Sequence, residues 1–149
     1  MPKFFGVASA DLGTLVKSNV LLANTVALTT ATPANITSIT LTPGDWDISG
    51  VINFRPAATT SVTNITTSAS LTSATLSPQA GGNGLGSDAT MAWNQAASVP
   101  AAVMAQEVPA VRLSITTTTT VYLVAQATFT VSTMTADGTI RANRVSAPA

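Results

Sequence analysis

The side chains that most often carry out enzymatic chemistry are missing from this sequence. It contains no histidine and no cysteine, so the commonest general base, the commonest metal ligand and the thiolate nucleophile are all absent. A Ser–His–Asp triad, a disulfide and a thiolate metal site cannot be built. The charged residues that remain are six acidic and six basic ones. We therefore expect a protein with no enzymatic activity, no catalytic residues and no cofactor.

Two acidic residues are close enough in the sequence to act as a pair. Asp45 and Asp47 share one face of a predicted strand, because side chains alternate along an extended chain. Two carboxylates fall short of the roughly six to eight oxygens that calcium requires. A glycosidase would need two acids about 5 to 10 Å apart across a cleft, and no pattern in the sequence indicates such a groove. We interpret Asp45 as closing a turn and Asp47 as facing solvent, with no metal bound.

Phosphate binding is not indicated either. The glycine-rich segment GGNGLG at residues 81–86 lacks the Lys-Ser/Thr of a P-loop and its βαβ context. We interpret it as a flexible loop. The basic residues are scattered apart from one pair near the C-terminus, whereas nucleic-acid binding needs clustered cations. We expect no direct contact with nucleic acid.

The low charge of the chain is its most unusual property. Only 8% of the residues are charged and the net charge is zero, against about 25% charged residues in an ordinary soluble domain. Such a chain has little electrostatic protection against self-association. We expect a surface rich in hydroxyls and partly buried in a homo-oligomer, with a trimer favoured over a dimer. The apolar stretch at residues 20–28 is much shorter than the ~20 residues of a membrane helix, so no membrane contact is expected.

Alternation of apolar and polar residues predicts strands through most of the chain. Trp46, Ile48, Ile52 and Phe54 share one face of a strand and are predicted to be core residues. The preceding TPGD, residues 42–45, predicts a hairpin with a strand through residues 36–41.

The C-terminal third shows the same alternation at residues 111–115 and 121–131. Ala136-Asp137-Gly138 predicts a further hairpin turn, followed by a closing strand over residues 139–145. Roughly seven or eight short antiparallel strands are typical of an all-β sandwich, with a jelly roll favoured. An immunoglobulin-like sandwich is the alternative, although its Cys–Trp–Cys framework is missing.

Two segments do not follow the strand pattern. We assign residues 1–24 to an N-terminal arm and residues 25–149 to a single β-sandwich domain. Residues 77–109 are predicted to be a long irregular loop in which MAWNQA, residues 91–96, could form a short strand. The arm, the loop and the C-terminal arginines supply the residues that we predict to contact a partner: Lys3, Phe4, Phe5, Leu12, Leu15, Trp93, Arg141 and Arg144.

Residues 41–54, LTPGDWDISGVINF, and residues 111–145 together resemble small virion proteins of tailed bacteriophages. The resemblance is to the jelly-roll head-decoration, or cement, proteins of short-tailed phages. It implies a virion structural protein that binds the major capsid protein on the outer surface of the capsid and holds neighbouring coat subunits together. The alternative is a phage receptor-binding or fibre-tip module, in which Trp93 or loop residues would stack on a host glycan.

Overall fold

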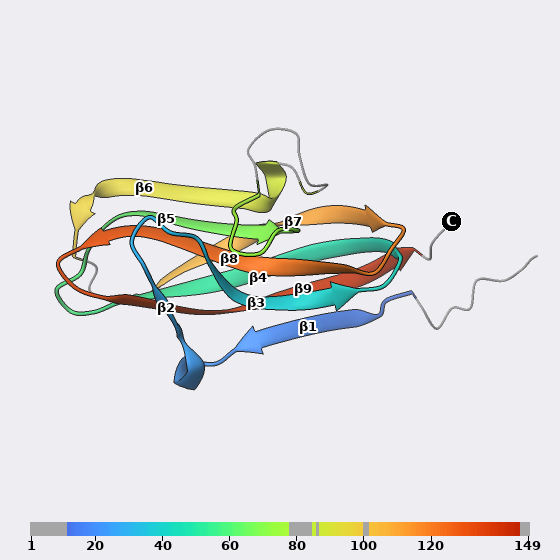
Figure 1. The fold of residues 1–149 in the computed structure, drawn as a ribbon, viewed down its shortest axis with the longest axis horizontal. Helices are drawn as coiled ribbons and strands as arrows, with labels where there is room; N and C mark the ends of the chain where they lie inside the picture. Colours follow the sequence, from blue (N-terminus) through green and yellow to red (C-terminus); the bar gives the residue numbers. More distant parts are fainter. Residues whose placement is uncertain (1–11, 78–84, 86, 100–101, 147–149) are drawn as a thin grey trace, which may run out of the picture.

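Two antiparallel β-sheets packed face to face form the described part of the chain (Figure 1). The computed structural model describes residues 12–77, 85, 87–99 and 102–146. The all-β sandwich predicted from the alternation is therefore confirmed. Its elements are β1 (Leu15–Val20), η1 (Leu22–Asn24), β2 (Val26–Leu28), β3 (Ala34–Leu41), β4 (Gly44–Pro56), β5 (Ser61–Ser70), η2 (Ser87–Ala89), β6 (Thr90–Ser98), β7 (Met104–Ile115), β8 (Thr119–Thr130) and β9 (Met134–Ser146).

The strand order places sequence-distant strands side by side. The five-stranded sheet has the order β1-β9-β4-β7, with β2 also paired to β9, and the four-stranded sheet has the order β3-β8-β5-β6. Every pairing is antiparallel. In Figure 1 the edge strand β6 lies at the top of the view and the edge strand β1 at the bottom.

The core lies between the two sheets and contains the aromatic residues predicted for it. Trp46 and Phe54 are 1% and 0% exposed, and Ile48 and Ile52 are fully buried beside them. Burying each side chain of this size contributes roughly 1.5 to 3 kcal/mol of transfer free energy. The alternation pattern therefore identified the buried face of β4 correctly.

Two glycines let the sheets approach closely at the centre of this core. Leu123 on β8 is fully buried, and its methyl groups lie where side chains of Gly50 and Gly138 would otherwise project. A Cβ atom added at Gly50 would be 3.3 Å from Leu123 Cδ1, and one added at Gly138 would be 3.2 Å from Leu123 Cδ2. The leucine from one sheet thus fills a hole that two glycines leave in the other.

The hairpin predicted across residues 42–45 is wrong. β3 pairs with β8 in the four-stranded sheet, whereas β4 pairs with β7 and β9 in the five-stranded sheet. Leu41 and Trp46 enter the same core from opposite sheets. The alternation shows that one face of each strand is buried, but it does not show which strand lies alongside. The short connection carries the chain across the sandwich.

The turn predicted at Ala136-Asp137-Gly138 is also wrong, because these residues lie inside β9. Asp137 is paired with Asn53, and Gly138 with Ile52. The chain reverses earlier, between β8 and β9. Glycine is required here for close packing within the sandwich, and a short-range Asp-Gly signal does not distinguish that requirement from a turn.

Residues predicted to be arm or loop also contribute strands. β1 pairs with β9 from Leu15 opposite Asn143 to Val20 opposite Gly138, so the sandwich includes part of the segment before residue 25. The predicted loop at residues 77–109 contains η2, β6 and the start of β7. The strand suggested at residues 91–96 is confirmed as part of β6.

Replacing Gly138 by alanine is expected to destabilise the fold strongly. The added Cβ would lie 2.5 Å from the backbone oxygen of Val51 as well as against Leu123. A backbone atom cannot yield without disturbing the ladder between β4 and β9, so we expect a loss of roughly 2 to 4 kcal/mol in the free energy of unfolding. Urea denaturation measures this loss.

Gly13→Ala is the control. Gly13 has a φ of +79°, but no atom lies within 4 Å of the added Cβ, so this substitution should lower the free energy of unfolding by only about 1 kcal/mol. Equal losses at the two positions would contradict the packing argument.

Candidate functional site

The residues predicted to contact a partner lie in separate places. Lys3, Phe4 and Phe5 fall outside the described residues. Leu12 and Leu15 are about half exposed, and Leu15 and Arg141 line one shallow depression of about 370 Å³ on the five-stranded sheet. Trp93 is also half exposed, but it belongs to β6 in the other sheet.

Arg144 occupies an interior position. Its side chain is nine-tenths buried, and its guanidinium carbon lies 4.9 Å from the centre of the Trp46 ring, a cation–π arrangement. The same guanidinium donates hydrogen bonds to Thr42 Oγ1 at 2.7 Å and to the carbonyl of Pro43. Arg144 therefore braces the connection between β3 and β4 within its own chain.

An apolar groove opens between β6 and β7, the facing edge strands of the two sheets. This β6–β7 groove has a volume of about 610 Å³. Trp93 is paired with the core residue Ile65 across β5 and β6, so both side chains lie on the inner face of the four-stranded sheet. The indole nevertheless remains 48% exposed, because the sandwich is not closed at this edge. The lining residues are Ile65, Met91, Ala92, Trp93, Met104, Ala105 and Gln106.

Gln106 is the polar side chain of this groove. It is 8% exposed, and its Oε1 has no hydrogen-bond partner among the described residues. Nearby, Thr67 Oγ1 donates to the carbonyl of Glu107 at 2.8 Å, so the backbone at this point of β7 is satisfied while the Gln106 side chain is not. A buried acceptor without a partner costs roughly 1 to 3 kcal/mol. Because this oxygen is itself shielded from solvent, the groove presents to an incoming group mainly the apolar side chains that line it.

Trp93 was predicted from the sequence as a contact residue, whereas Gln106 was not. Met104, Gln106 and Val108 alternate toward the core, and this pattern could have revealed a polar residue on an apolar strand face. The alternation along this strand is interrupted because the register of β7 shifts between Val108 and Val111, beside Pro109.

A second apolar surface lies at one end of the sandwich. Val99 and Val103, in the connection between β6 and β7, are 54% and 46% exposed, and Val131, in the turn between β8 and β9, is 81% exposed. The pairing of Val62 with both Ser98 and Phe129 places the two connections at the same end. We call Val99, Val103 and Val131 the apolar end. Val131 has a φ of +76°, which is unfavourable for a β-branched residue.

Charge is divided unequally between the sheets. β3, β8, β5 and β6 contain no Asp, Glu, Lys or Arg. A partner could cover the strands of the four-stranded sheet without taking a charged side chain out of water. Burial of an unpaired charge is the most costly form of desolvation. The strands of the five-stranded sheet contain Lys17, Asp45, Asp47, Arg55, Glu107, Arg112, Asp137, Arg141 and Arg144.

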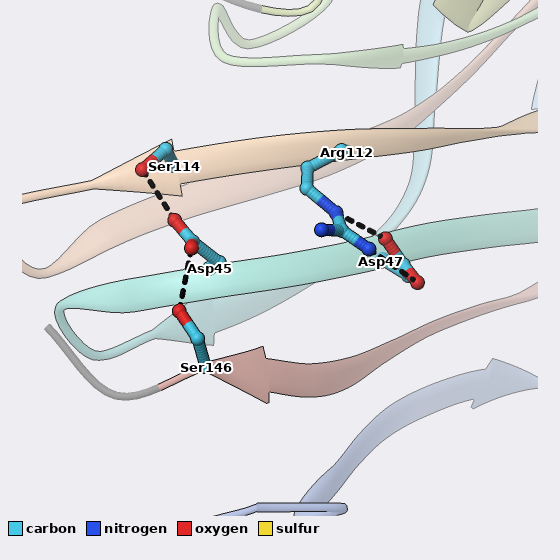
Figure 2. Close-up of polar contacts among 5 residues, drawn as sticks. All are labelled: Asp45, Asp47, Arg112, Ser114 and Ser146. Atoms are coloured by element: carbon cyan, nitrogen blue, oxygen red, sulfur yellow. Dashed lines mark hydrogen bonds and ion pairs between the residues drawn. The ribbon is translucent and has the colours of Figure 1, made fainter.

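Asp45 and Asp47 have separate partners along the outer face of this sheet, as Figure 2 shows. Asp45 accepts hydrogen bonds from Ser114 and Ser146, and these bonds, the one from Ser114 foremost, lower the pKa of Asp45. Asp47 accepts from Arg112 Nε at 2.9 Å. Within residues 12–77, 85, 87–99 and 102–146 no three acidic side chains gather into a possible metal site.

Substituting Gln106 by methionine is expected to stabilise the isolated chain. The change removes a buried acceptor that has no partner and keeps a side chain of similar volume in an apolar groove. We expect a gain of roughly 1 kcal/mol in the free energy of unfolding, measured with urea. Thr67→Val, which removes a buried hydroxyl with a partner, should lower stability instead. A loss of stability in Gln106→Met would show that the amide is already satisfied.

Acid should weaken the fold through Asp137, which is 5% exposed and accepts hydrogen bonds from Arg55 and from Asn53 at 2.8 Å. Burial raises its pKa, but the two hydrogen bonds and the charge of Arg55 together lower the pKa below its usual value. A lowered folded-state pKa adds stability above the unfolded-state pKa, about 3.9, and this stability disappears as the pH falls through the folded-state value. Urea titrations below about pH 5 should therefore show a smaller acid-induced loss in Asp137→Asn than in the parent. If Asp137→Asn and the parent lose the same stability in acid, Asp137 does not contribute to the acid sensitivity of the fold.

Comparisons with known proteins identify no relative. No protein-family model, curated protein or solved structure matches the chain. The described residues include no helix that is both long and apolar enough to cross a membrane.

Proposed function

We propose that this chain is a bacteriophage virion protein that binds the outer surface of the capsid and cements neighbouring coat subunits. The observation that carries the proposal is the apolar end, where three large apolar side chains stay exposed in connections that could have been polar. Contiguous exposed apolar patches mark protein contacts, and we propose that these three side chains belong to one. In this proposal the apolar end meets the coat proteins, and the chain acts as a structural protein without catalysis.

The strand order supports the jelly-roll part of the proposal. Apart from the short β2, the pairs β1–β9, β3–β8, β4–β7 and β5–β6 are nested in the sequence. A long antiparallel ribbon folded at β5 and β6 would give these pairs. Rolling that ribbon creates the additional contacts β4–β9 and β5–β8. A rolled ribbon of eight strands is the arrangement of a jelly roll, the fold expected from the resemblance to decoration proteins.

The strained backbone of Val131 adds to the case for the apolar end. A left-handed conformation costs a β-branched residue on the order of 1 kcal/mol or more. Asparagine or glycine would adopt it more easily, yet this position holds an apolar side chain that is 81% exposed. In the proposed contact, burial of this apolar side chain against a partner would offset the free-energy cost of the strained backbone.

Weak individual contacts are sufficient for cementing. A protein held at several points of a symmetric shell binds its second point at high effective concentration. A small apolar end on each copy can therefore give lasting attachment to a particle. The scarcity of charge, 8% of all residues, also makes this attachment less sensitive to salt than an ionic contact would be.

One arrangement favours the alternative of a glycan-binding fibre-tip module. The half-exposed indole of Trp93 lines the apolar β6–β7 groove. A sugar ring can stack on such an indole. This alternative places the function in the β6–β7 groove, whereas cementing places it at the apolar end.

Substitutions at the two ends of the sandwich test the cementing role. Val131→Lys puts a charge at the apolar end and also removes a β-branched residue from the left-handed region. We expect the variant to fold and to lose at least about tenfold in affinity for capsids that lack this protein, because a buried lysine without a partner is costly. Co-sedimentation with such capsids measures the loss.

Thr118→Lys is the matched control, since Thr118 is exposed in the turn between β7 and β8 at the opposite end. Equal capsid binding by both variants and the parent would exclude the apolar end as the contact. Binding of the parent to a glycan array, lost in Trp93→Ala and kept in Val131→Lys, would establish the fibre-tip alternative instead.

A further inference from the structure

β6 is an edge strand with an unusual degree of exposure. It is the outermost strand of the four-stranded sheet, and within the described part of the chain it pairs only with β5. Seven of its nine residues are exposed and the other two are partly exposed. Its sequence, TMAWNQAAS, contains no charge, no proline and no glycine. Residues 90–94 pair with β5 in continuous register, and the irregularity is confined to the segment between Asn94 and Ser98.

Apart from the three-residue strand β2, the other edge strands carry features that prevent pairing with a further strand. β7 contains Pro109, Glu107 and Arg112 and has a shift in its register. β1 contains Lys17, and it faces β3 across the sandwich, where Ser18 Oγ lies 2.5 Å from Thr37 Oγ1. Charges, prolines, bulges and cover are the devices that keep sheet edges from pairing between molecules.

β3 is protected mainly by cover. Its register shifts between Asn35 and Thr37, and the Asn35 side chain is hydrogen-bonded to Ser73 and to the backbone nitrogen of Ala74. The segment that follows β5 is thereby fastened to β3. β3 and β6 are both neutral and free of proline, but β3 is covered at Asn35, whereas seven of the nine residues of β6 are exposed.

We propose that β6 pairs antiparallel with β6 of a second copy of this chain, joining two four-stranded sheets into one. Every second residue of an edge strand directs its N–H and C=O away from the sheet, and a second strand satisfies these groups. An antiparallel strand can meet its own copy about a two-fold axis, so one patch serves both subunits.

The neutrality of β6 argues for a second copy as its occupant. A charged strand that pairs with itself about a two-fold axis brings like charges near each other, which is destabilising. β6 has no charge, and neither have the three strands beside it in the sheet. When the faces of the two sheets are aligned, Met91 and Trp93 of both copies share the inner face. Both side chains are more than 40% exposed in the single chain.

Pairing through β6 produces a dimer, whereas a trimer was the oligomer expected from the sequence. A three-fold contact is head-to-tail and needs a second, different edge to receive β6. The candidates for that edge carry the protective features described above. One strand also supplies fewer residues than the roughly 20 to 30 per partner of a stable interface. The dimer should therefore be weak in solution and be reinforced where many copies are held on one particle.

Opposite charges placed on β6 test the pairing directly. Ala92 is exposed near the middle of the regular part of the strand. Sedimentation equilibrium of the parent should show a concentration-dependent dimer. Ala92→Lys and Ala92→Glu should each weaken that dimer at least about tenfold, because the two-fold axis brings like charges together. An equimolar mixture of the two variants should restore association through opposite charges.

Ala110→Lys is the matched control, because Ala110 is an exposed alanine on the edge strand β7; it should leave the dimer unchanged. A parent that remains monomeric, a parent trimer, or a mixture that fails to associate would overturn the pairing. The result is independent of the proposed function. A dimer that does not bind capsids refutes only the cementing role, and a monomer that binds capsids refutes only the pairing.

Discussion

The sandwich depends on the contact of Leu123 with two glycines. β4 and β9, with 13 residues each, are the longest strands, and Gly50 and Gly138 lie directly opposite the leucine from the other sheet. Larger residues at either glycine would push the sheets apart over the whole area that β4 and β9 cover. Trp46 and Phe54 project from β4 into the same layer, so their burial requires the spacing that the glycines permit. Protein cores tolerate little change in volume, which makes a hole filled from the opposite sheet a strong constraint.

The sequence predicts which faces are buried better than which strands are neighbours. Period-2 alternation placed Trp46 and Phe54 in the core correctly, because alternation is a direct consequence of burying one face of a strand. The same pattern could not distinguish a hairpin from a crossing between sheets at residues 42–45. It also could not show that Gly138 serves close packing, since that role depends on Leu123 and Val51, which are distant in the sequence. For the candidate site, Trp93 was predicted from its irregular surroundings, while the alternation that places Gln106 on the buried face of β7 is interrupted by the register shift beside Pro109.

Hydroxyl groups explain how this chain folds with so few ions. A hydroxyl can donate and accept a hydrogen bond, so threonine and serine can be buried without a charged partner. Thr67 and Ser68 are fully buried; Thr67 bonds to the backbone of β7, and Ser68 Oγ lies 2.8 Å from Thr90 Oγ1. The four-stranded sheet meets its polar requirements in this way and presents no ionic group on its strands. The charged residues of the strands belong to the five-stranded sheet, where Arg112 and Asp47 pair within the chain on the outer face and Arg144 packs on Trp46 in the interior.

The exposed edge of β6 and the β6–β7 groove are two parts of the same incompletely covered side of the sandwich. Among the residues that the structure describes, β6 has a strand on one side only, and its inner face borders a groove in which Gln106 Oε1 has no hydrogen-bond partner. A strand with few buried contacts opens locally at a lower free energy than the core strands do. A partner that binds only the ordered strand stabilises it in proportion to the free energy of binding. In the proposed dimer, each contact that covers this edge would also order the strand that forms it, so the stability of β6 would be coupled to assembly.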